Sequence, residues 1–243
     1  MPELDLRFIG TGNAFAPGGL CWNGFILEGK YLFEAPPQAL QSINAMRLDA
    51  NDLDAVVLSH HHGDHFLGLP FLLLQWKAAK RTRPIRIIGP RGTKQLAIDI
   101  GQSVYPWLFE TEFEVEWEEL TDTSQSSFGE LTLDAVAVKH DARLSGTLGF
   151  HIGLHGRRIG YTGDSARCDA VLDLARSSEV LISECASLDE TIPTHMNLRD
   201  DIPLVRAAMA PEARLILTHL GPGVTAAGLA NTEVAQDYGS YRI

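Results

Sequence analysis

The sequence Ser59-His60-His61-His62-Gly63-Asp64-His65 places four histidines and a carboxylate within seven residues. One apolar run ends at Ser59 and another starts at Phe66, so the stretch lies between two segments of the buried type. A single histidine is usually structural, and an adventitious metal-binding tract is expected in a polar low-complexity segment. The clustering and its apolar surroundings therefore predict a metal site that is built into the fold.

The side chains of this stretch indicate which metals it suits. His60 and His62 alternate out of a strand end and can point the same way, while Gly63 permits the turn that brings Asp64 and His65 around. Imidazole nitrogen and carboxylate oxygen without cysteine suit zinc, with manganese or iron as alternatives. The stretch can therefore contribute ligands to two divalent ions.

The bulk composition is that of an ordinary globular protein. The chain has 243 residues, of which 45% are hydrophobic and 21% charged. That length can bury about 70–75% of the unfolded surface, and no apolar run approaches the roughly 20 residues that cross a bilayer. The N-terminal residues show no secretory signal, and three widely spread cysteines do not suggest a disulfide framework. We therefore expect a soluble cytoplasmic protein that does not associate with membranes.

The formal net charge of −11 bears on the class of substrate. Proteins that hold long stretches of nucleic acid neutralise phosphates with a basic face. The acidic balance argues against extended nucleic-acid binding of that kind. Substrate affinity is then expected to be centred on the metal ions, with a small molecule or a nucleotide as the partner.

The order of apolar runs predicts an α/β fold in a single domain, because short strand-like runs alternate with helix-like stretches and no linker or repeat interrupts them. Residues 110–118 alternate glutamate with other residues, which predicts a half-exposed strand with a solvated acidic face. Residues 149–161 are typical of a hairpin. The other predicted strands are residues 4–10, 24–33, 54–59, 84–88, 131–139, 157–162, 179–183 and 213–218. The predicted helices are residues 37–47, 65–80, 93–104, 169–177, 199–209 and part of 225–237.

Metal-competent side chains follow several of these strands. The 59–65 stretch comes after residues 54–59, and His140, Asp164 and His219 each come directly after a later apolar run. Open α/β sheets bind ligands in the crevice at the carboxyl ends of their strands. If these strands share a sheet, the four segments converge on one site.

The motif matches the HxHxDH signature of the metallo-β-lactamase superfamily, and the chain resembles the ribonuclease Z branch of that superfamily. The resemblance implies a four-layer αβ/βα sandwich formed by residues 1–243 as a single domain. It covers nearly the whole chain, through Gly10-Thr11-Gly12-Asn13, Val57-Leu58-Ser59, residues 66–73, Ile88-Gly89-Pro90, His140, Tyr161-Thr162-Gly163-Asp164-Ser165, Ser183-Glu184, His195 and Leu217-Thr218-His219.

The same resemblance implies a ligand set for two metal ions. One ion would be held by His60, His62 and His140, a second by Asp64, His65 and His219, and Asp164 would bridge them. The resemblance implies two roles for Asp64, as a metal ligand and as a catalytic residue. A water between two such ions has a lowered pKa, so a metal-bound hydroxide can attack at neutral pH.

Two further residues match catalytic positions of the ribonuclease Z-like enzymes. His195 corresponds to the histidine that acts near the leaving group, and Glu184 to the glutamate that orients it. A carboxylate beside an imidazole raises the population of the imidazolium, which can then donate a proton. The remaining histidines His61, His151 and His155 are interpreted as structural or solvent-exposed.

The sequence departs from ribonuclease Z proper in two places. Only 23 residues separate His140 from Asp164, where ribonuclease Z carries a long tRNA-binding arm. The aromatic and arginine signature that usually follows the last histidine is also missing after His219. Both departures shift the expected substrate from tRNA to a small or nucleotide-type phosphodiester, with tRNA 3′-processing kept as the alternative.

Relatives without the arm cleave small phosphodiesters, and among them the cyclic-ribose phosphodiesterase of phosphonate breakdown pairs HxHxDH with a later His-Asn element, here His195-Met196-Asn197. Thioester or lactone hydrolysis and a non-catalytic metal-binding sensor are the lesser alternatives. Homodimers are common in the family that the chain resembles, and the sequence alone leaves the oligomeric state open.

Overall fold

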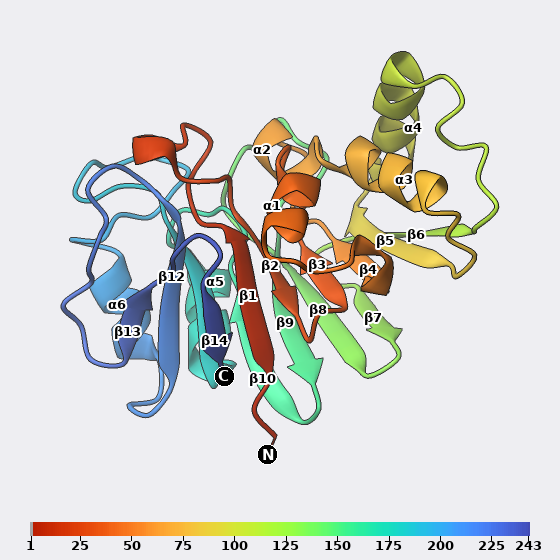
Figure 1. Cartoon of the computed structure of the whole chain (residues 1–243). Helices are drawn as coiled ribbons and strands as arrows, with labels where there is room; N and C mark the ends of the chain where they lie inside the picture. Colours follow the sequence, from red (N-terminus) through yellow and green to blue (C-terminus); the bar gives the residue numbers. More distant parts are fainter. Residues whose placement is uncertain (1) are drawn as a thin grey trace.

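Two seven-stranded sheets face each other in the computed structural model, which describes residues 2–243 (Figure 1). The strand order is β14-β1-β2-β3-β4-β5-β6 in the first sheet and β13-β12-β11-β10-β9-β8-β7 in the second. Helices cover the outer face of each sheet, which confirms the four-layer sandwich. Met1, which the expected domain 1–243 includes, lies outside the described residues. Among residues 2–243, no helix has the length and apolar character needed to span a bilayer.

The first sheet and its helices come from the N-terminal half of the chain together with the last strand. The strands β3, β4, β5 and β6 are parallel to one another, so their carboxyl ends lie at one edge. The strands are β1 (Asp5–Gly10), β2 (Gly24–Leu27), β3 (Tyr31–Phe33), β4 (Ala55–Val57), β5 (Ile85–Pro90), β6 (Val115–Leu120) and β14 (Ser240–Arg242). The helical segments are η1 (Pro17–Gly19), α1 (Ala39–Ala45), η2 (Ala50–Asp52), α2 (Gly63–Phe66), α3 (Leu69–Ala78) and α4 (Thr93–Val104).

The second sheet comes from the C-terminal half. Its strands β10, β11, β12 and β13 run parallel, while β7, β8 and β9 are antiparallel. The strands are β7 (Gln125–Phe128), β8 (Leu131–Ala137), β9 (Leu148–Leu154), β10 (Arg157–Tyr161), β11 (Val180–Cys185), β12 (Arg214–Leu220) and β13 (Thr232–Val234). The helices are α5 (Asp169–Ser177) and α6 (Ile202–Ala208).

Three apolar layers hold the sandwich together. The central layer lies between the sheets and includes Phe8, Phe25 and Phe150. The second layer packs α1 and α3 on the outer face of the first sheet around Trp76, and the third packs α5 and α6 on the second sheet. β11 is buried at every position because both of its faces are covered, whereas β8 alternates buried and exposed residues. The sheets therefore form a rigid frame whose strand ends can position a site.

Several predicted elements differ from the observed ones because of local packing. The predicted strand 24–33 is two strands, with a turn at Glu28 and Gly29, both of which have positive φ. The predicted helix 65–80 is divided into α2 and α3 at Gly68, where an added Cβ would lie 2.0 Å from the carbonyl oxygen of Pro36. The strand predicted at 110–118 begins only at Val115, because the side chain of Thr111 donates to the carbonyl oxygen of Phe113 in the preceding turn.

The prediction of a helix within residues 225–237 was wrong. Gly228 and Asn231 have positive φ, which a right-handed helix does not contain. Residues 232–234 instead form β13, which pairs in parallel with β12. The exposed edge of β12 offers backbone hydrogen bonds that a short amphipathic segment can take as a strand, and periodicity alone cannot separate the two outcomes.

Candidate metal centre

The strand ends bring the predicted ligands to one edge of the sandwich. His60 and His62 follow β4 of the first sheet, and Asp64 and His65 lie in the adjoining helix α2. The second sheet contributes three ligands from three of its strands. They are His140 after β8, Asp164 after β10 and His219 within β12, and all seven side chains fall into groups whose ligand atoms lie within 4.8 Å of one another.

The first group consists of three imidazoles. His62 Nδ1 lies 3.2 Å from His60 Nε2 and 3.0 Å from His140 Nε2. Nitrogens that coordinate one zinc ion at about 2.0–2.1 Å in a tetrahedron are roughly 3.3 Å apart. The three nitrogens therefore have a spacing that fits the corners of one coordination site.

The second group lies beside the first and combines a carboxylate with two imidazoles. Asp64 Oδ2 lies 3.2 Å from His65 Nε2 and 3.5 Å from His219 Nε2. His65 and His219 are almost fully buried, at 0% and 1% exposure. This arrangement offers a second site whose ligand atoms face the same space as those of the first.

Asp164 lies between the two groups. Its Oδ2 is 3.2 Å from His219 Nε2 and 3.3 Å from His65 Nε2, and 3.7 Å and 3.9 Å from the Nε2 atoms of His60 and His140. Burial opposes ionisation of this carboxyl, but the nearby imidazoles of His219 and His65 hold its pKa well below the usual range. One carboxylate oxygen thus faces ligands of both groups, as a bridging ligand would.

The unpaired buried atoms of this cluster fit bound cations. Asp64 Oδ2, His65 Nε2 and His219 Nε2 are buried and have no hydrogen-bond partner in the described residues. Leaving a buried polar group without a partner costs about 1–3 kcal/mol, more when the group is charged. Divalent ions held by these atoms would remove that cost, and the donor set of imidazole and carboxylate matches zinc, manganese or iron.

His195 and Glu184 form a hydrogen-bonded pair next to this cluster. His195 Nδ1 lies 2.8 Å from Glu184 Oε1, and its ring centroid lies 4.8 Å from that of His140. Glu184 is 1% exposed and accepts hydrogen bonds from the backbone N–H groups of Ser165, Ala186 and Met196. Burial alone would lower the pKa of His195, but the hydrogen bond and charge of Glu184 outweigh it and raise that pKa to about 9.

A family model described as the β-lactamase superfamily domain matches residues 27–220, which is most of the chain. The chain belongs to the metallo-β-lactamase superfamily. Its enzyme class is that of the metal-dependent hydrolases, and the resemblance to the ribonuclease Z branch is confirmed by similar proteins. Ribonuclease Z of Thermococcus kodakarensis is 28% identical over 56% of this chain and 43% of that protein, so the chain spans less than half of this relative. Ribonuclease BN of Escherichia coli is 25% identical over 79% of each chain.

Solved structures confirm the fold of this superfamily member. A diphosphatase from the PhnP family matches with a TM-score of 0.78 and 17% identity, covering 99% of this chain and 98% of that one. The short form of human tRNase Z matches with a TM-score of 0.75 and 22% identity, covering 98% of each chain. The two neighbours have different names and the same fold, so the fold does not distinguish their substrates.

Oxygen atoms lie close to the outer ring nitrogens of three of the predicted ligand histidines. Ser59 Oγ lies 2.8 Å from His60 Nδ1, and the carbonyl oxygen of Thr194 lies 3.1 Å from His140 Nδ1. Asp141 Oδ2 lies 3.5 Å from His62 Nε2. An acceptor at the outer nitrogen directs the inner nitrogen toward a metal. The sequence analysis missed these roles, because only Asp141 and Ser59 adjoin a ligand in the chain and Thr194 acts through its backbone.

Glu34 places a carboxylate near the outer ring nitrogen of His65 without a hydrogen bond to it, and the sequence analysis also missed this residue. Its Oε2 lies 3.5 Å from His65 Nδ1, and its backbone has a positive φ of 64° at the end of β3. Tyr161 donates a hydrogen bond of 3.0 Å to Glu34 Oε1 and accepts one from Asn23, which in turn accepts one from Thr218. These buried side chains link the two sheets beneath the metal centre. An acidic residue directly after an apolar strand is the signal that could have identified Glu34.

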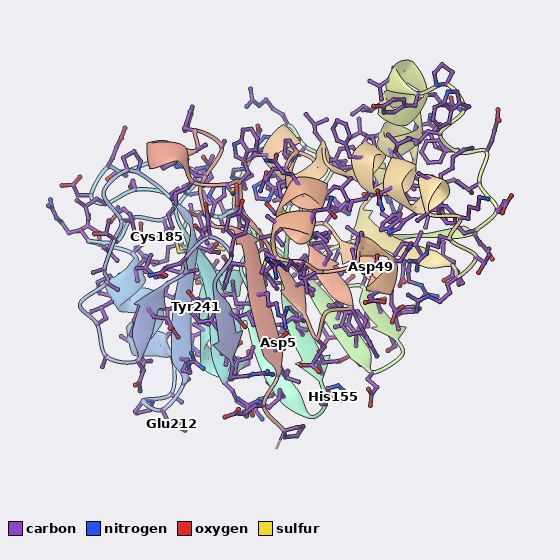
Figure 2. The ribbon with its side chains drawn as sticks, viewed as in Figure 1. Asp5, Asp49, His155, Cys185, Glu212 and Tyr241 are labelled. Carbon is purple, nitrogen blue, oxygen red and sulfur yellow. The ribbon has the colours of Figure 1, made fainter. Side chains whose placement is uncertain are left out.

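The remaining histidines lie outside the cluster. His155 is in the turn between β9 and β10, far from the ligand end of the sheets (Figure 2), and lies 3.3 Å from Glu130. His151 contacts Ser177, and His61 Nε2 lies 2.7 Å from Thr93 Oγ1 at the start of α4. All three contacts agree with the structural interpretation. Cys185, beside Glu184, is fully buried, and burial raises the pKa of its thiol.

Proposed function

We propose that this hydrolase cleaves a phosphodiester in a small or nucleotide-type substrate at a centre of two divalent ions, with zinc as the expected metal. The observation that carries the proposal is the position of Asp164, whose Oδ2 lies within 3.9 Å of ligand nitrogens from both groups. A carboxylate in that position can be shared by two adjacent metal ions. Two divalent ions, when bound, lower the pKa of a coordinated water and stabilise charge on a phosphoryl oxygen.

His195 supplies the proton that the leaving group needs. Hydrolysis forms a bond between phosphorus and the water oxygen and breaks the bond between phosphorus and the departing ester oxygen. His195 Nδ1 is engaged by Glu184, so its Nε2 is the atom free to donate the proton to that oxygen. Glu184 accepts hydrogen bonds from three backbone N–H groups, which fix its carboxylate so that it holds the imidazole in one orientation.

The segment between His140 and Asp164 supports a small substrate. After the loop 141–147 it is used by β9 and β10, which belong to the second sheet. The net charge of −11 likewise disfavours contacts with a long phosphate backbone. Processing of tRNA 3′ ends remains the second candidate, because the similar proteins of Thermococcus and Escherichia are named ribonuclease Z and ribonuclease BN.

An activity screen tests this proposal. We expect purified protein with two equivalents of metal to hydrolyse bis-p-nitrophenyl phosphate, and to act on thioesters and lactones far more slowly. Metal-loaded protein that hydrolyses none of the three classes would instead support a non-catalytic sensor. Cleavage of a precursor tRNA at its 3′ end, faster than that of the small diester, would establish the second candidate.

A further inference from the structure

The loop of residues 186–201, which connects β11 to α6, carries His195 but has little apolar packing around it. Within the described chain, residues 188–195 contribute no side chain to the three apolar layers, and Met196 is the first fully buried residue after them. Segments with few buried apolar contacts open more readily than the core of a protein. A proton donor on such a loop therefore needs other contacts to hold it at the metal centre.

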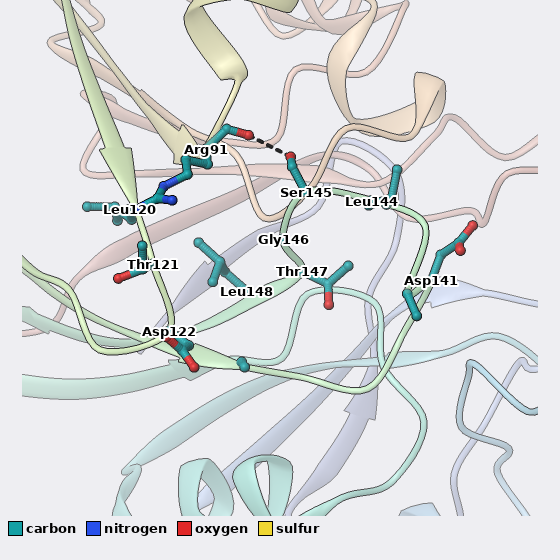
Figure 3. Close-up of a pocket in the computed structure, with 12 residues that line it drawn as sticks. Arg91, Leu120, Thr121, Asp122, Asp141, Leu144, Ser145, Gly146, Thr147 and Leu148 are labelled. Atoms are coloured by element: carbon teal, nitrogen blue, oxygen red, sulfur yellow. Dashed lines mark hydrogen bonds between the residues drawn. The ribbon is translucent and has the colours of Figure 1, made fainter.

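A second loop beside the metal centre, residues 141–147 after His140, is held by close packing. Ser145 donates a hydrogen bond of 2.5 Å to the carbonyl oxygen of Arg91 (Figure 3). At Gly146 an added Cβ would lie 3.0 Å from the side chain of Pro90, so this loop packs directly on the turn after β5. The loop that carries His195 depends instead on polar contacts.

Three of those polar contacts lie around His195 itself. His195 Nδ1 lies 2.8 Å from Glu184 Oε1, and the backbone N–H of Met196 donates to the same carboxylate. The carbonyl oxygen of Thr194 lies 3.1 Å from His140 Nδ1. The first contact weakens when His195 gives up its proton, because a hydrogen bond between a carboxylate and a neutral imidazole is weaker than one with the imidazolium. The contacts around His195 therefore hold it least firmly once the proton has been transferred.

Further contacts anchor the loop on its C-terminal side. Asp201 Oδ2 accepts a hydrogen bond of 3.1 Å from the backbone N–H of Asn197, and Asn197 Oδ1 accepts one of 2.7 Å from the backbone N–H of Asp200. The other oxygen of Asp201 accepts a hydrogen bond of 3.0 Å from Arg167 Nε. One carboxylate thus links Arg167 to the backbone two residues after His195.

The position of Arg167 in the chain connects this anchor to the metal centre. Arg167 comes three residues after Asp164, the candidate bridging ligand, on the segment that follows β10. That segment is itself fixed, because the backbone N–H of Ala166 donates a hydrogen bond of 2.7 Å to the carbonyl oxygen of Lys139. The side chains of the ion pair are 40% and 18% exposed, so water screens it only in part. The pair therefore relates the position of the proton donor to that of the bridging ligand.

We propose that Arg167 and Asp201 are positioning residues, which hold the loop so that His195 Nε2 faces the leaving group of a substrate at the metal centre. The proposal rests on the proposed function and adds that proton transfer, more than the attack of water, depends on this ion pair. In that transfer the N–H bond of the His195 imidazolium breaks together with the ester P–O bond, and the proton joins the departing oxygen.

Two symmetrical diesters with different leaving groups test this assignment. p-Nitrophenolate departs without a proton, whereas benzyl alkoxide is a much stronger base and needs one. The full chain, loaded with zinc, is therefore assayed on bis-p-nitrophenyl phosphate and on dibenzyl phosphate. Arg167→Ala and Asp201→Asn should each lower kcat for dibenzyl phosphate by at least about tenfold, because a misplacement of about 1 Å can cost about 10²-fold. Their kcat for bis-p-nitrophenyl phosphate should stay close to that of the wild type.

Matched variants complete the experiment. Arg167→Lys keeps the positive charge and should recover most of the kcat for dibenzyl phosphate. The double variant should lose no more than either single variant, because the same ion pair is broken in all three. Arg199→Ala breaks an exposed ion pair of the same loop, with Asp189 at 2.8 Å, and should keep both activities. Mass spectrometry and circular dichroism check that each variant is loaded with metal and folded.

The outcomes separate this assignment from the proposed function. Equal losses on the two diesters, or no loss on either, overturn the role of the ion pair and leave diester hydrolysis standing. A wild-type protein that cleaves only the nitrophenyl diester has no effective proton donor, which overturns the assignment together with the role of His195. If protein with its full metal content hydrolyses neither diester, the proposed function itself fails.

Discussion

At the residue scale, most of the predicted ligand histidines have an oxygen atom close to the ring nitrogen that points away from the candidate metal centre. Four of the five imidazoles have an oxygen within 3.5 Å of the outer ring nitrogen, from Ser59, Asp141, Thr194 or Glu34. An imidazole that bonds through its outer nitrogen has one tautomer and one orientation left for its inner nitrogen. The inner nitrogens of His60 and His140, whose outer nitrogens are hydrogen-bonded, are therefore already directed toward the shared space.

The ligand histidines and His195 are expected to respond differently to alanine substitution. His62→Ala removes a first-group ligand and should reduce the bound metal from two ions toward one per chain. His195→Ala removes the proton donor, so it should keep both ions and lose about 10²–10⁴-fold in kcat. Metal content is measured by mass spectrometry beside steady-state kinetics. Equal loss of metal in the two variants would contradict this division of roles.

Glu34 is expected to strengthen metal binding through His65. Glu34→Gln keeps the size of the side chain and the acceptor for Tyr161, but removes the charge that faces His65 Nδ1. The resulting Kd for metal should rise by about 10–100-fold, as measured by competition with a chromogenic chelator. Ser42→Ala is the matched control, because Ser42 is buried in α1 away from the cluster. An unchanged Kd in Glu34→Gln would show that Glu34 only fills space.

At the element scale, the carboxyl ends of the strands supply every predicted ligand, and the backbone turns sharply where they end. Glu34 after β3 and His219 in β12 have positive φ although neither is glycine. Such conformations cost about 1–3 kcal/mol and persist only where the surroundings require them. These are two of the nine non-glycine residues with positive φ among residues 2–243, and both belong to the candidate metal centre or contact it.

Substitution of Gly163 by alanine tests how tightly one of these turns is packed. It has a φ of 54°, and an added Cβ would lie 2.6 Å from the carbonyl oxygen of Leu148. Gly163→Ala should therefore lower the free energy of unfolding by about 3 kcal/mol or more, through strain and overpacking together. Gly29→Ala is the matched control, since Gly29 has a φ of 67° and open space around it, and about 1 kcal/mol is expected. Urea denaturation measures both, and equal losses would show that packing against Leu148 is unimportant.

At the scale of the whole molecule, the candidate metal centre draws its side chains from both sheets. His60, His62, Asp64 and His65 belong to the first half of the chain, and His140, Asp164 and His219 to the second. Ions bound between them would be bound by the folded state and not by the unfolded chain. The free energy of binding then adds to the stability of the fold.

Removal of metal is accordingly expected to destabilise the whole sandwich. At free metal of about 1,000 times the Kd, one bound ion adds about 4 kcal/mol. For a chain of this size that corresponds to a fall in Tm on the order of 10 °C after chelation. Differential scanning calorimetry with and without EDTA measures it, and added zinc should restore the Tm. His62→Ala should show a smaller chelator effect, and a Tm that EDTA does not change would argue against metal ions between the sheets.

The sequence by itself determined the superfamily and the α/β architecture, because the HxHxDH stretch is local and the apolar strands are long. It also predicted seven metal ligands, and the fold brings their side chains together. The bounds of α4 and α5 were also predicted correctly from their periodicity. Short edge strands such as β13 and β14 were not predicted, since three residues carry too little periodicity and their pairing depends on a neighbouring strand.

Only the tertiary structure decided what surrounds the ligands. Glu34 meets His65 and Tyr161 across sequence separations of 31 and 127 residues, and Ser145 in the loop after His140 donates a hydrogen bond to the backbone carbonyl oxygen of Arg91. An acidic or basic residue in the sequence does not reveal which buried nitrogen or open cavity it faces, because the packing of two sheets sets that distance. The motif therefore predicted a metal site, whereas the contacts that surround it depend on how the two halves of the chain come together.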